Sequence, residues 1–426
     1  MFSWGFSFWL NARSVRAYDC GHGSGRFGLS KVRGWVAGEL GLGFLAFGVF
    51  VVAVVLHVRF WPETLVRIST DSMTIHADFD TFWRSTAALW TGSDAYDTGA
   101  SLVNLNPPFW TVLLAPFGLM EAFSAYRLFS MLMFALAAGC LIWTAREMKL
   151  RAGWTVVAVA LLLISSPLLA TSALGQLYPI LTLGLVACWT FERRGKPVLS
   201  GVALGLTVAI KPSLLPVLLW PVARLRWGML GAAMASGAAA TILGVVVLGL
   251  GATFDWVDIV LHESLSTYWD NASLPAAAAR LFAENRYAAP LADAPWMVSL
   301  AYSLGILAVF VTAAKVRDDG DAGLWALVAA ALLASPIAWH NYLVLLGPGI
   351  LVLMARGRWG VGLVLIALQT IPPQWPLLWA GKGTTLASLG LTFYLLVLAL
   401  HWLAFLFAGE KRASPATGAV VEEQAL

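Results

Sequence analysis

Residues 229–251 read MLGAAMASGAAATILGVVVLGLG, a run of 23 residues without one charged side chain. A helix of that length, rising about 1.5 Å per residue, spans the roughly 30 Å hydrocarbon core of a bilayer. Similar uncharged windows recur from Leu40 to Leu406. Backbone groups in lipid must bond within their own segment or a closed barrel, and long apolar runs without alternation select helices. The stretch therefore predicts a chain that crosses a membrane as α-helices.

The overall composition agrees with this prediction. Of 426 residues, 59% are hydrophobic and only 12% are charged, which excludes a water-soluble chain. Cys20 lies in a basic tail, and Cys140 and Cys188 lie in apolar runs, so no disulfide framework or CxxC site is expected. The sequence has no HExxH, Walker A or GxSxG motif, and we expect neither metal nor nucleotide chemistry.

Twelve apolar runs of helix length are separated by charges and turn residues. They cover residues 40–57, 128–145, 154–171, 177–191, 198–210, 212–223, 229–251, 296–314, 323–335, 342–355, 359–372 and 384–408. Several hold only about 12–16 residues, so some must continue through polar connectors to cross the bilayer. We therefore predict an all-α polytopic membrane protein with about 12 transmembrane helices in one membrane domain, residues 35–408.

The distribution of lysine and arginine predicts the orientation. If both termini are cytoplasmic, nineteen of these residues lie inside and eight outside, in agreement with the positive-inside rule. The prediction gives cytoplasmic tails over 1–34 and 409–426 and large outer loops over 58–127 and 252–295. The first tail carries a net charge of +4 and is expected to anchor the first span rather than to bind nucleic acid. The expected location is the plasma (inner) membrane.

The first outer loop contains an apolar run that is too short to span. Pro107–Met120 makes roughly 21 Å of helix, less than the bilayer core. We predict that this run lies along the outer membrane face. Asn106 would be its N-cap, and Pro107 would take the first helical position, where a missing N–H costs nothing.

The same loop contains a second, amphipathic helix that opens with Asp78-Phe79-Asp80-Thr81-Phe82-Trp83. The apolar residues at 79, 82, 83, 87 and 90 share one helical face. Two interpretations of the acidic start remain open. Asp78 or Asp80 could be the N-cap, or a carboxylate at the edge of a membrane cavity could act as general base on a sugar hydroxyl.

Two further breaks between apolar runs carry polar residues at the predicted outer side. Gln176 lies in the turn Ser172–Pro179 and either stabilises that turn or contacts a substrate. Lys211 precedes Pro212, which accounts for the break but not for the lysine. The ammonium either reaches the outer headgroups or binds a lipid phosphate.

A third break, Ser335–Tyr342, places Trp339 and His340 at about the membrane depth of Gln176 and Lys211. A lone histidine can be a structural hydrogen-bonding group or part of an active site, and the sequence leaves both interpretations open.

The order of these motifs resembles glycosyltransferase family 87, the polyprenol-phosphate-mannose-dependent mannosyltransferases of the GT-C superfamily. The five matching motifs are a helix that opens with Asp78-Phe79 and Phe82-Trp83 and ends with Leu89, Gly92 and Tyr96; Asn106-Pro107-Pro108; Gly175-Gln176; Ala209-Ile210-Lys211-Pro212; and Ser335-Pro336-Ile337-Ala338-Trp339 followed by His340. Each motif is weak alone, but five in order are fairly specific. Asn106 stands where the family often has tyrosine.

The resemblance implies a GT-C-like fold and the transfer of a sugar, most simply mannose, from a polyprenyl-phosphate-sugar donor. The acceptor would be a hydroxyl of a glycolipid or cell-envelope glycan at the outer face. The implied roles are Asp78 as base, His340 as a second active-site group, Lys211 and Arg84 near the donor phosphate, Trp339 against the sugar, and Gln176, Asn106 and Tyr96 as further substrate contacts. Because the phosphate is already a leaving group, no cofactor is implied, and in-line displacement inverts the anomeric centre.

Other function classes remain open at this stage. Short helices interrupted by glycine and proline are also typical of secondary transporters and lipid flippases. No inverted repeat is visible, however, and the polar groups cluster toward the outer face rather than the midplane. An arabinofuranosyltransferase of the same superfamily and a ligase that moves whole glycans are further alternatives.

Overall fold

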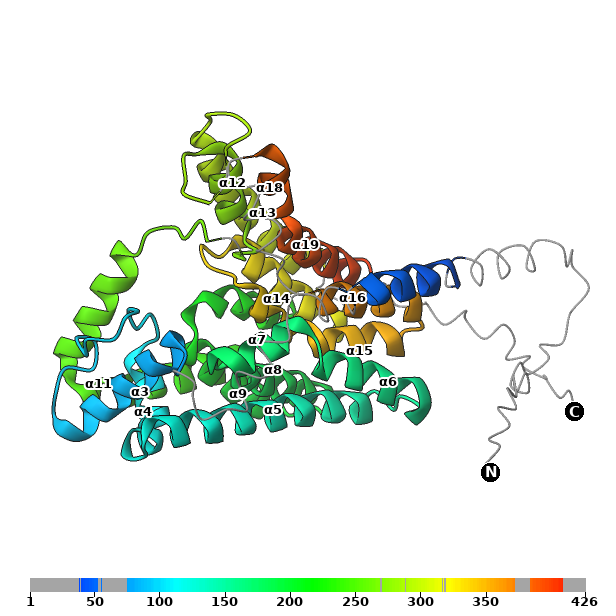
Figure 1. The fold of residues 1–426 in the computed structure, drawn as a ribbon. Coiled ribbons are helices and arrows are strands. Elements are labelled where there is room, and N and C mark those ends of the chain that lie inside the picture. The colour runs from blue at the N-terminus through cyan, green and yellow to red at the C-terminus, as the bar shows by residue number, and fades with distance from the viewer. Residues whose placement is uncertain are drawn as a thin grey trace, which may run out of the picture.

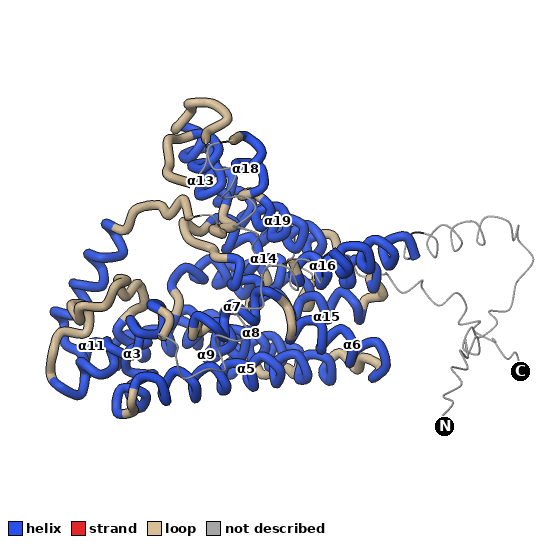
Figure 2. The backbone as a smooth tube through the Cα atoms, in the orientation of Figure 1, coloured by secondary structure: helices blue, strands red, loops and turns tan. Residues whose placement is uncertain are grey.

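The computed structural model describes residues 38–55 except 39, 53 and 54, residues 75–371 except 269, 288, 316 and 318, and residues 384–408. In this part of the chain every regular element is a helix, and one antiparallel bridge joins Asn271 to Trp339 (Figures 1 and 2). The predicted tails over 1–34 and 409–426 lie outside the described residues.

Most helices coincide with the apolar runs of the sequence. They are Leu40–Val52, α3 (Ala77–Thr91), α4 (Pro108–Leu114), η1 (Ala115–Leu119), α5 (Ala122–Glu147), α6 (Ala152–Leu163), α7 (Ser166–Leu174), α8 (Tyr178–Arg193), α9 (Pro197–Ile210), η2 (Pro212–Leu218), α10 (Leu219–Ala223), α11 (Trp227–His262), α12 (Leu274–Phe282), α13 (Trp296–Lys315), α14 (Ala322–Ala334), η3 (His340–Leu346), α15 (Gly347–Ala355), α16 (Trp359–Thr370), α18 (Thr385–Gly390) and α19 (Phe393–Leu406). The elements labelled η are 3₁₀ helices.

Four helices of the described residues are long and apolar enough to cross a membrane. They are α5, α11, α13 and the stretch Ser388–Leu406, and α6 with α7 forms a fifth candidate that bends by 44°. Seven shorter apolar helices of 10–17 residues accompany them. The prediction of a multi-pass, all-helical membrane protein is confirmed, whereas about 12 crossings remains a prediction.

Helix α14 lies at the centre of the bundle. Twelve of its 13 residues are buried, and it packs against α13, α19 and η2. A helix that is apolar on every side can be surrounded by other helices, because none of its faces carries polar side chains that require water. It ends at Ser335, where the chain breaks before η3.

Helix α11 differs from the sequence-based prediction. The expected span ended at residue 251, but the helix continues to His262 past a break at Gly249, whose φ of 90° and ψ of 165° suit glycine. Its last part therefore occupies the beginning of the predicted outer loop 252–295. The indole N–H of Trp256 donates to the carbonyl of Leu105 at 3.2 Å, so this part packs against the first outer loop.

Ion pairs connect the turns between helices at one end of the bundle. Arg194 binds Glu147 at 2.7 Å, Arg226 binds Glu192 at 2.8 Å, Arg356 binds Asp319 at 2.6 Å, and Arg193 pairs with Asp321. These pairs connect the turns after α5, α8, α10, α13 and α15, which are the turns assigned to the cytoplasm by the charge distribution. We call this the paired end of the bundle.

Candidate functional site

The breaks that carry the predicted site residues lie at the other end of the same helices. Helix α8 runs 16 residues from Tyr178 to Arg193, about 24 Å at 1.5 Å per residue, so its start is far from the paired end. The start of α3, the α7–α8 turn, the α9–η2 break and the α14–η3 break all approach this opposite end. The site is described below from these four breaks and the loop before α12.

The start of α3 presents Asp78 without using it as a cap. The N-cap is His76, whose Nδ1 faces both the amide N–H of Asp78 at 3.3 Å and its carboxylate at 2.9 Å. Of the two interpretations left open by the sequence, the one that makes Asp78 or Asp80 the N-cap is therefore wrong. The helix begins at Ala77, and its N-cap lies two residues before Asp78. The Asp78 side chain stays 26% exposed.

The next residue, Phe79, anchors this start in the core. Its ring lies 5.3 Å from that of Tyr126 and 5.4 Å from that of Phe129. A Cβ on Gly175 would come within 2.7 Å of the Phe79 Cβ, so only glycine allows the α7–α8 turn to approach α3 this closely. Gly175 also has the left-handed φ of 67°. Gln176 is thereby held beside the start of α3.

The Gln176 side chain is 7% exposed, and its amide makes no hydrogen bond within the described residues. A buried amide without partners costs free energy, so this group is available for a ligand or water. The sequence-based alternatives were turn stabilisation and substrate contact. The turn itself is closed by the backbone bond from the Gln176 N–H to the Thr171 carbonyl at 2.9 Å, not by the side chain.

Two stacked tyrosines connect the candidate residues. The rings of Tyr178 and Tyr342 lie 4.2 Å apart, and the Lys211 ammonium lies 5.8 Å from the centre of the Tyr342 ring. Tyr178 is also within electrostatic range of Asp78 and Asp270. Lys211 is half-buried at the end of α9 and has no carboxylate partner within the described residues. The structure thus brings Lys211 and two carboxylates around one tyrosine pair.

His340 forms a buried pair with Asp270. The Nδ1 of the imidazole lies 2.6 Å from the Asp270 carboxylate, and the His340 backbone N–H donates to the Asp270 carbonyl at 3.1 Å. Because an ionised carboxylate only accepts, the hydrogen resides on Nδ1, and Nε2 is left free to accept or, in the imidazolium, to donate. His340 is 4% exposed and Asp270 8% exposed.

Several buried polar atoms around this pair have no partner in the described part of the chain. They are His340 Nε2, Asp270 Oδ1, and both side-chain polar atoms of Asn341. Buried polar atoms in folded proteins nearly always have partners. Four unpartnered atoms on three neighbouring residues therefore mark a position where a polar ligand or water belongs.

Asn271 fastens the Asp270 loop to the His340 loop. Its side-chain amide donates to the carbonyls of Ser266 and Pro336 at 3.0 and 2.9 Å, and its oxygen accepts from the N–H groups of Ala338 and Ser273 at 2.9 and 3.2 Å. It is fully buried. The two bonds to Pro336 and Ala338 cross between the loops and explain why these distant parts of the sequence keep a fixed relative position.

Arg280 of α12 holds the same loop from the other side. The guanidinium donates to the carbonyls of Tyr268 and Asn271 at 2.9 and 2.8 Å, and to that of Leu391 at 3.2 Å. Burial lowers the pKa of Arg280 to about 10, against the opposing attraction of Asp270. The side chain is therefore still a cation near neutral pH.

Trp339 provides an aromatic surface next to His340. Its half-buried ring packs edge-on against Tyr268 at 5.8 Å, and its backbone bridges to Asn271. Arg84 lies elsewhere. It pairs with Asp80 at 2.8 Å on the exposed side of α3, and no contact within the described residues joins it to Lys211.

Asn106 and Tyr96 form a separate cluster. Asn106 is not the cap of the surface helix, because α4 begins at Pro108 with Pro107 as its N-cap. The buried Asn106 amide instead donates to Asn104 at 3.3 Å, and its own Oδ1 has no partner. The Tyr96 hydroxyl donates to the Asn106 carbonyl at 2.8 Å. Burial, then Asp255 and Asp94, raise the pKa of Tyr96, so this hydroxyl stays protonated.

The candidate site also contains residues that the sequence did not single out, namely Asp270, Asn341, Tyr178 and Tyr342. Asn341 and Tyr342 lie inside the motif that carries His340, and Tyr178 follows Gln176 by two positions. Asp270 lies in the predicted outer loop 252–295, directly after Tyr268 and Trp269. An acidic residue beside a run of aromatics was the available signal.

Comparison with known proteins identifies the family. The model of glycosyltransferase family 87 matches residues 104–336, more than half of the chain. The chain belongs to glycosyltransferase family 87. The matched stretch includes Gln176, Lys211 and Asp270, while Asp78 and His340 lie outside it. Membership makes this membrane protein a glycosyltransferase and disfavours the transporter interpretation.

Two curated relatives are similar to the family 87 chain. One is the polyprenol-phosphate-mannose-dependent alpha-(1-2)-phosphatidylinositol mannoside mannosyltransferase of Mycobacterium tuberculosis, 26% identical over 367 residues, which cover 79% of each chain. The other is the alpha-(1->3)-arabinofuranosyltransferase of Mycolicibacterium smegmatis, 28% identical over 185 residues. That alignment covers 40% of this chain and 43% of the relative.

One solved structure is also similar, ArnT from Cupriavidus metallidurans bound to undecaprenyl phosphate. It is 17% identical with a TM-score of 0.35, and the alignment covers 88% of this chain and 77% of that one. A likeness of that size does not establish a shared fold.

Proposed function

We propose that the protein transfers a sugar, most simply mannose, from a polyprenyl-phosphate-sugar to a hydroxyl of a glycolipid or cell-envelope glycan. The observation that carries this proposal is the grouping at one end of the bundle. Within the described residues Lys211 has no carboxylate partner and His340 Nε2 has no hydrogen bond, and two carboxylates lie within electrostatic range of Tyr178. These are a cation, a hydrogen-bonding group and a base, the set that such a transfer requires.

The reaction is a single displacement in this proposal. The acceptor oxygen attacks the anomeric carbon, the bond from that carbon to the phosphate oxygen breaks, and the electron pair leaves with the phosphate. The acceptor proton passes to the Asp78 carboxylate. Attack from the face opposite the leaving group inverts the anomeric centre.

Asp78 is the better base of the two carboxylates. Asp270 is buried and engaged by His340, which leaves it suited to orienting the imidazole. The Asp78 carboxylate is partly exposed at the start of a helix, where an entering hydroxyl can reach it. Its neighbour His76 lies 2.9 Å away and provides a route for the proton out of the site.

Lys211 and His340 serve the leaving group. The phosphate gains negative charge as its bond to the sugar breaks, and cations or donors already aimed at it lower the barrier. The ammonium lies over the Tyr342 ring rather than against a carboxylate, so its charge is not neutralised before the donor arrives. Trp339 gives the sugar an apolar face, and Gln176 gives a hydroxyl an amide partner.

The relatives support a lipid-phosphate donor but differ in sugar. One is named for mannose and polyprenol phosphate, and the other for arabinofuranose. An arabinofuranosyl donor is therefore the second candidate. The outer face of the plasma membrane is proposed for the reaction, because the paired end carries the loops that the positive-inside rule assigns to the cytoplasm.

The test is transfer by the purified protein in proteoliposomes with radiolabelled polyprenyl-phosphate-mannose or polyprenyl-phosphate-arabinofuranose and lipid extracts as acceptor. Label should move from the first donor into a more polar glycolipid. Transfer from the arabinose donor alone would replace mannose by arabinofuranose. Absence of transfer from either donor in a folded protein that binds polyprenyl phosphate would overturn the proposal.

A further inference from the structure

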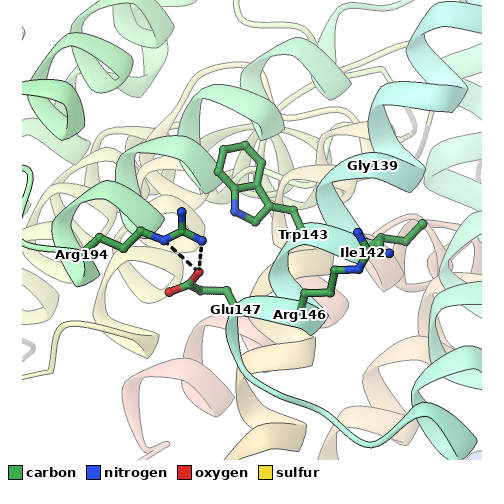
Figure 3. A pocket seen from close by; sticks show the side chains of 6 residues that line it. All are labelled: Gly139, Ile142, Trp143, Arg146, Glu147 and Arg194. Carbon is green, nitrogen blue, oxygen red and sulfur yellow. Dashed lines mark hydrogen bonds and ion pairs between the residues drawn. The ribbon is translucent and has the colours of Figure 1, made fainter.

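A groove unrelated to the candidate site runs along the end of α5. It encloses about 360 Å³ and is lined by Gly139, Ile142, Trp143, Arg146, Glu147 and Arg194 (Figure 3). The first four residues follow the spacing i, i+3, i+4 and i+7, so they form one face of the helix. The groove lies at the paired end, because Glu147 and Arg194 belong to the ion pairs there. Its first lining residue, Gly139, lies 17 positions after Ala122, where that helix starts.

The charges in and around the groove favour an anion. Arg194 donates through Nε and Nη2 to Glu147 at 3.2 and 2.7 Å, so this pair is neutral as a unit. Arg146 is exposed and has no ion pair or hydrogen bond from its side chain within the described residues. The adjoining turns 146–151 and 192–196 contain six cations and two carboxylates, a net charge of +4.

The other half of the groove is apolar and open. A Cβ on Gly139 would meet nothing within 4 Å, and Ile142 is 43% exposed. Figure 3 shows Trp143 between the Arg194–Glu147 pair and Arg146, whose side chain runs back along the helix beside Ile142. The indole N–H of Trp143 makes no hydrogen bond within the described residues, and its nitrogen faces the Arg194–Glu147 side of the groove (Figure 3).

We propose that this groove binds an anionic phospholipid of the bilayer leaflet at the paired end. The phosphate accepts from the Arg146 guanidinium, the Trp143 ring lies beside the headgroup, and the first part of an acyl chain lies over Gly139 and Ile142. A guanidinium is well suited to phosphate, and tryptophan is enriched at the depth of lipid headgroups. A basic pocket between helices on the cytoplasmic side is a favourable site for anionic headgroups. The inference is independent of the sugar and of the acceptor.

The measurement is native mass spectrometry of the full-length protein in detergent, titrated with phosphatidylglycerol, phosphatidylcholine or inorganic phosphate. The wild type should retain phosphatidylglycerol about tenfold more tightly than phosphatidylcholine. Arg146→Gln should weaken phosphatidylglycerol binding about tenfold, the loss of one charge-assisted contact. Lys196→Gln removes an equal charge from the same end outside the groove and should leave binding within a factor of two.

A second pair of variants tests the apolar half. Gly139→Phe adds a ring where a Cβ meets nothing within 4 Å, so it should block the acyl chain and reduce lipid binding about tenfold. Gly231→Phe on α11, where a Cβ also meets nothing within 4 Å, adds the same bulk elsewhere. Thermal unfolding in detergent reports whether all four variants are folded.

Three results would overturn the proposal. Equal retention of phosphatidylglycerol and phosphatidylcholine would show that the groove does not recognise an anionic headgroup. Competition by millimolar inorganic phosphate as effective as that by the lipid would make the groove a site for free anions. Equal losses in Arg146→Gln and Lys196→Gln would assign the effect to general charge.

Discussion

The fastening role of Asn271 can be tested by Asn271→Ala. The change removes four hydrogen bonds, of which two, with Pro336 and Ala338, tie the Asp270 loop to the His340 loop and two, with Ser266 and Ser273, lie within the Asp270 loop. At a net value of about 1 kcal/mol each, the loss is about 4 kcal/mol, with water entry reducing it. A protein with about 5–15 kcal/mol of stability survives such a loss, so the expected consequence is local loosening of the two loops.

The loosening should slow sugar transfer because it disturbs the 2.6 Å contact that positions the His340 imidazole against Asp270. A misplacement of about 1 Å in a catalytic group can cost about 100-fold in rate. We expect kcat for sugar transfer to fall at least about 100-fold, while the KM for the lipid donor changes less. Steady-state kinetics in proteoliposomes give both constants, and thermal unfolding in detergent gives the stability.

The matched control is Asn285→Ala in the same outer loop. Asn285 bonds to the carbonyls of Arg280 and Ala283 and accepts from the N–H of Tyr287, and none of these residues belongs to the His340 loop. It should lower stability without a comparable loss of kcat. If Asn271→Ala unfolds at a lower temperature yet keeps kcat within threefold of the wild type, the fixed Asp270–His340 geometry is not needed for transfer.

Three further predictions concern the base, the cation and the orientation. Asp78→Asn should reduce transfer roughly 10²–10⁴-fold in a protein that still binds donor. The control Asp80→Asn should break the pair with Arg84 and stay active. Near-normal transfer by Asp78→Asn would show that Asp78 is not the base. Lys211→Met should raise the KM for the donor and lower kcat, and unchanged kinetics would leave the ammonium a headgroup contact. In a background lacking Cys20, an impermeant thiol reagent should label a cysteine at Glu284 but not one at Lys196 in intact cells, and the opposite pattern would invert the topology.

The helices were predictable from the sequence because the signal for each is local. Apolar side chains recur on the face of α3 that carries Phe79 and Phe82, both of which are buried in the structure. The breaks at Gly175, Lys211 and Ser335 were predictable for the same reason, because glycine and proline end helices wherever they occur. The C-terminal end of α11 at His262 was not predictable, because Gly249 breaks the helix without ending it.

The partner of His340 was not predictable, because it lies 70 positions earlier in the chain. No local pattern encodes which outer loop folds over which break. That choice depends on tertiary contacts, here the side chain of the fully buried Asn271 and the carbonyl ligands of Arg280. Polar anchors of this kind have no periodicity, so neither helical spacing nor composition reveals them.

The two ends of the bundle differ in whether their polar groups have partners, and this difference indicates which end is functional. At the paired end Arg193, Arg226 and Arg356 each have a carboxylate, which removes the cost of holding charge near lipid. At the other end His340 Nε2 and the Asn341 amide are buried without partners in the described part of the chain. Unpartnered polar atoms lower stability, so a fold retains them where a ligand completes them.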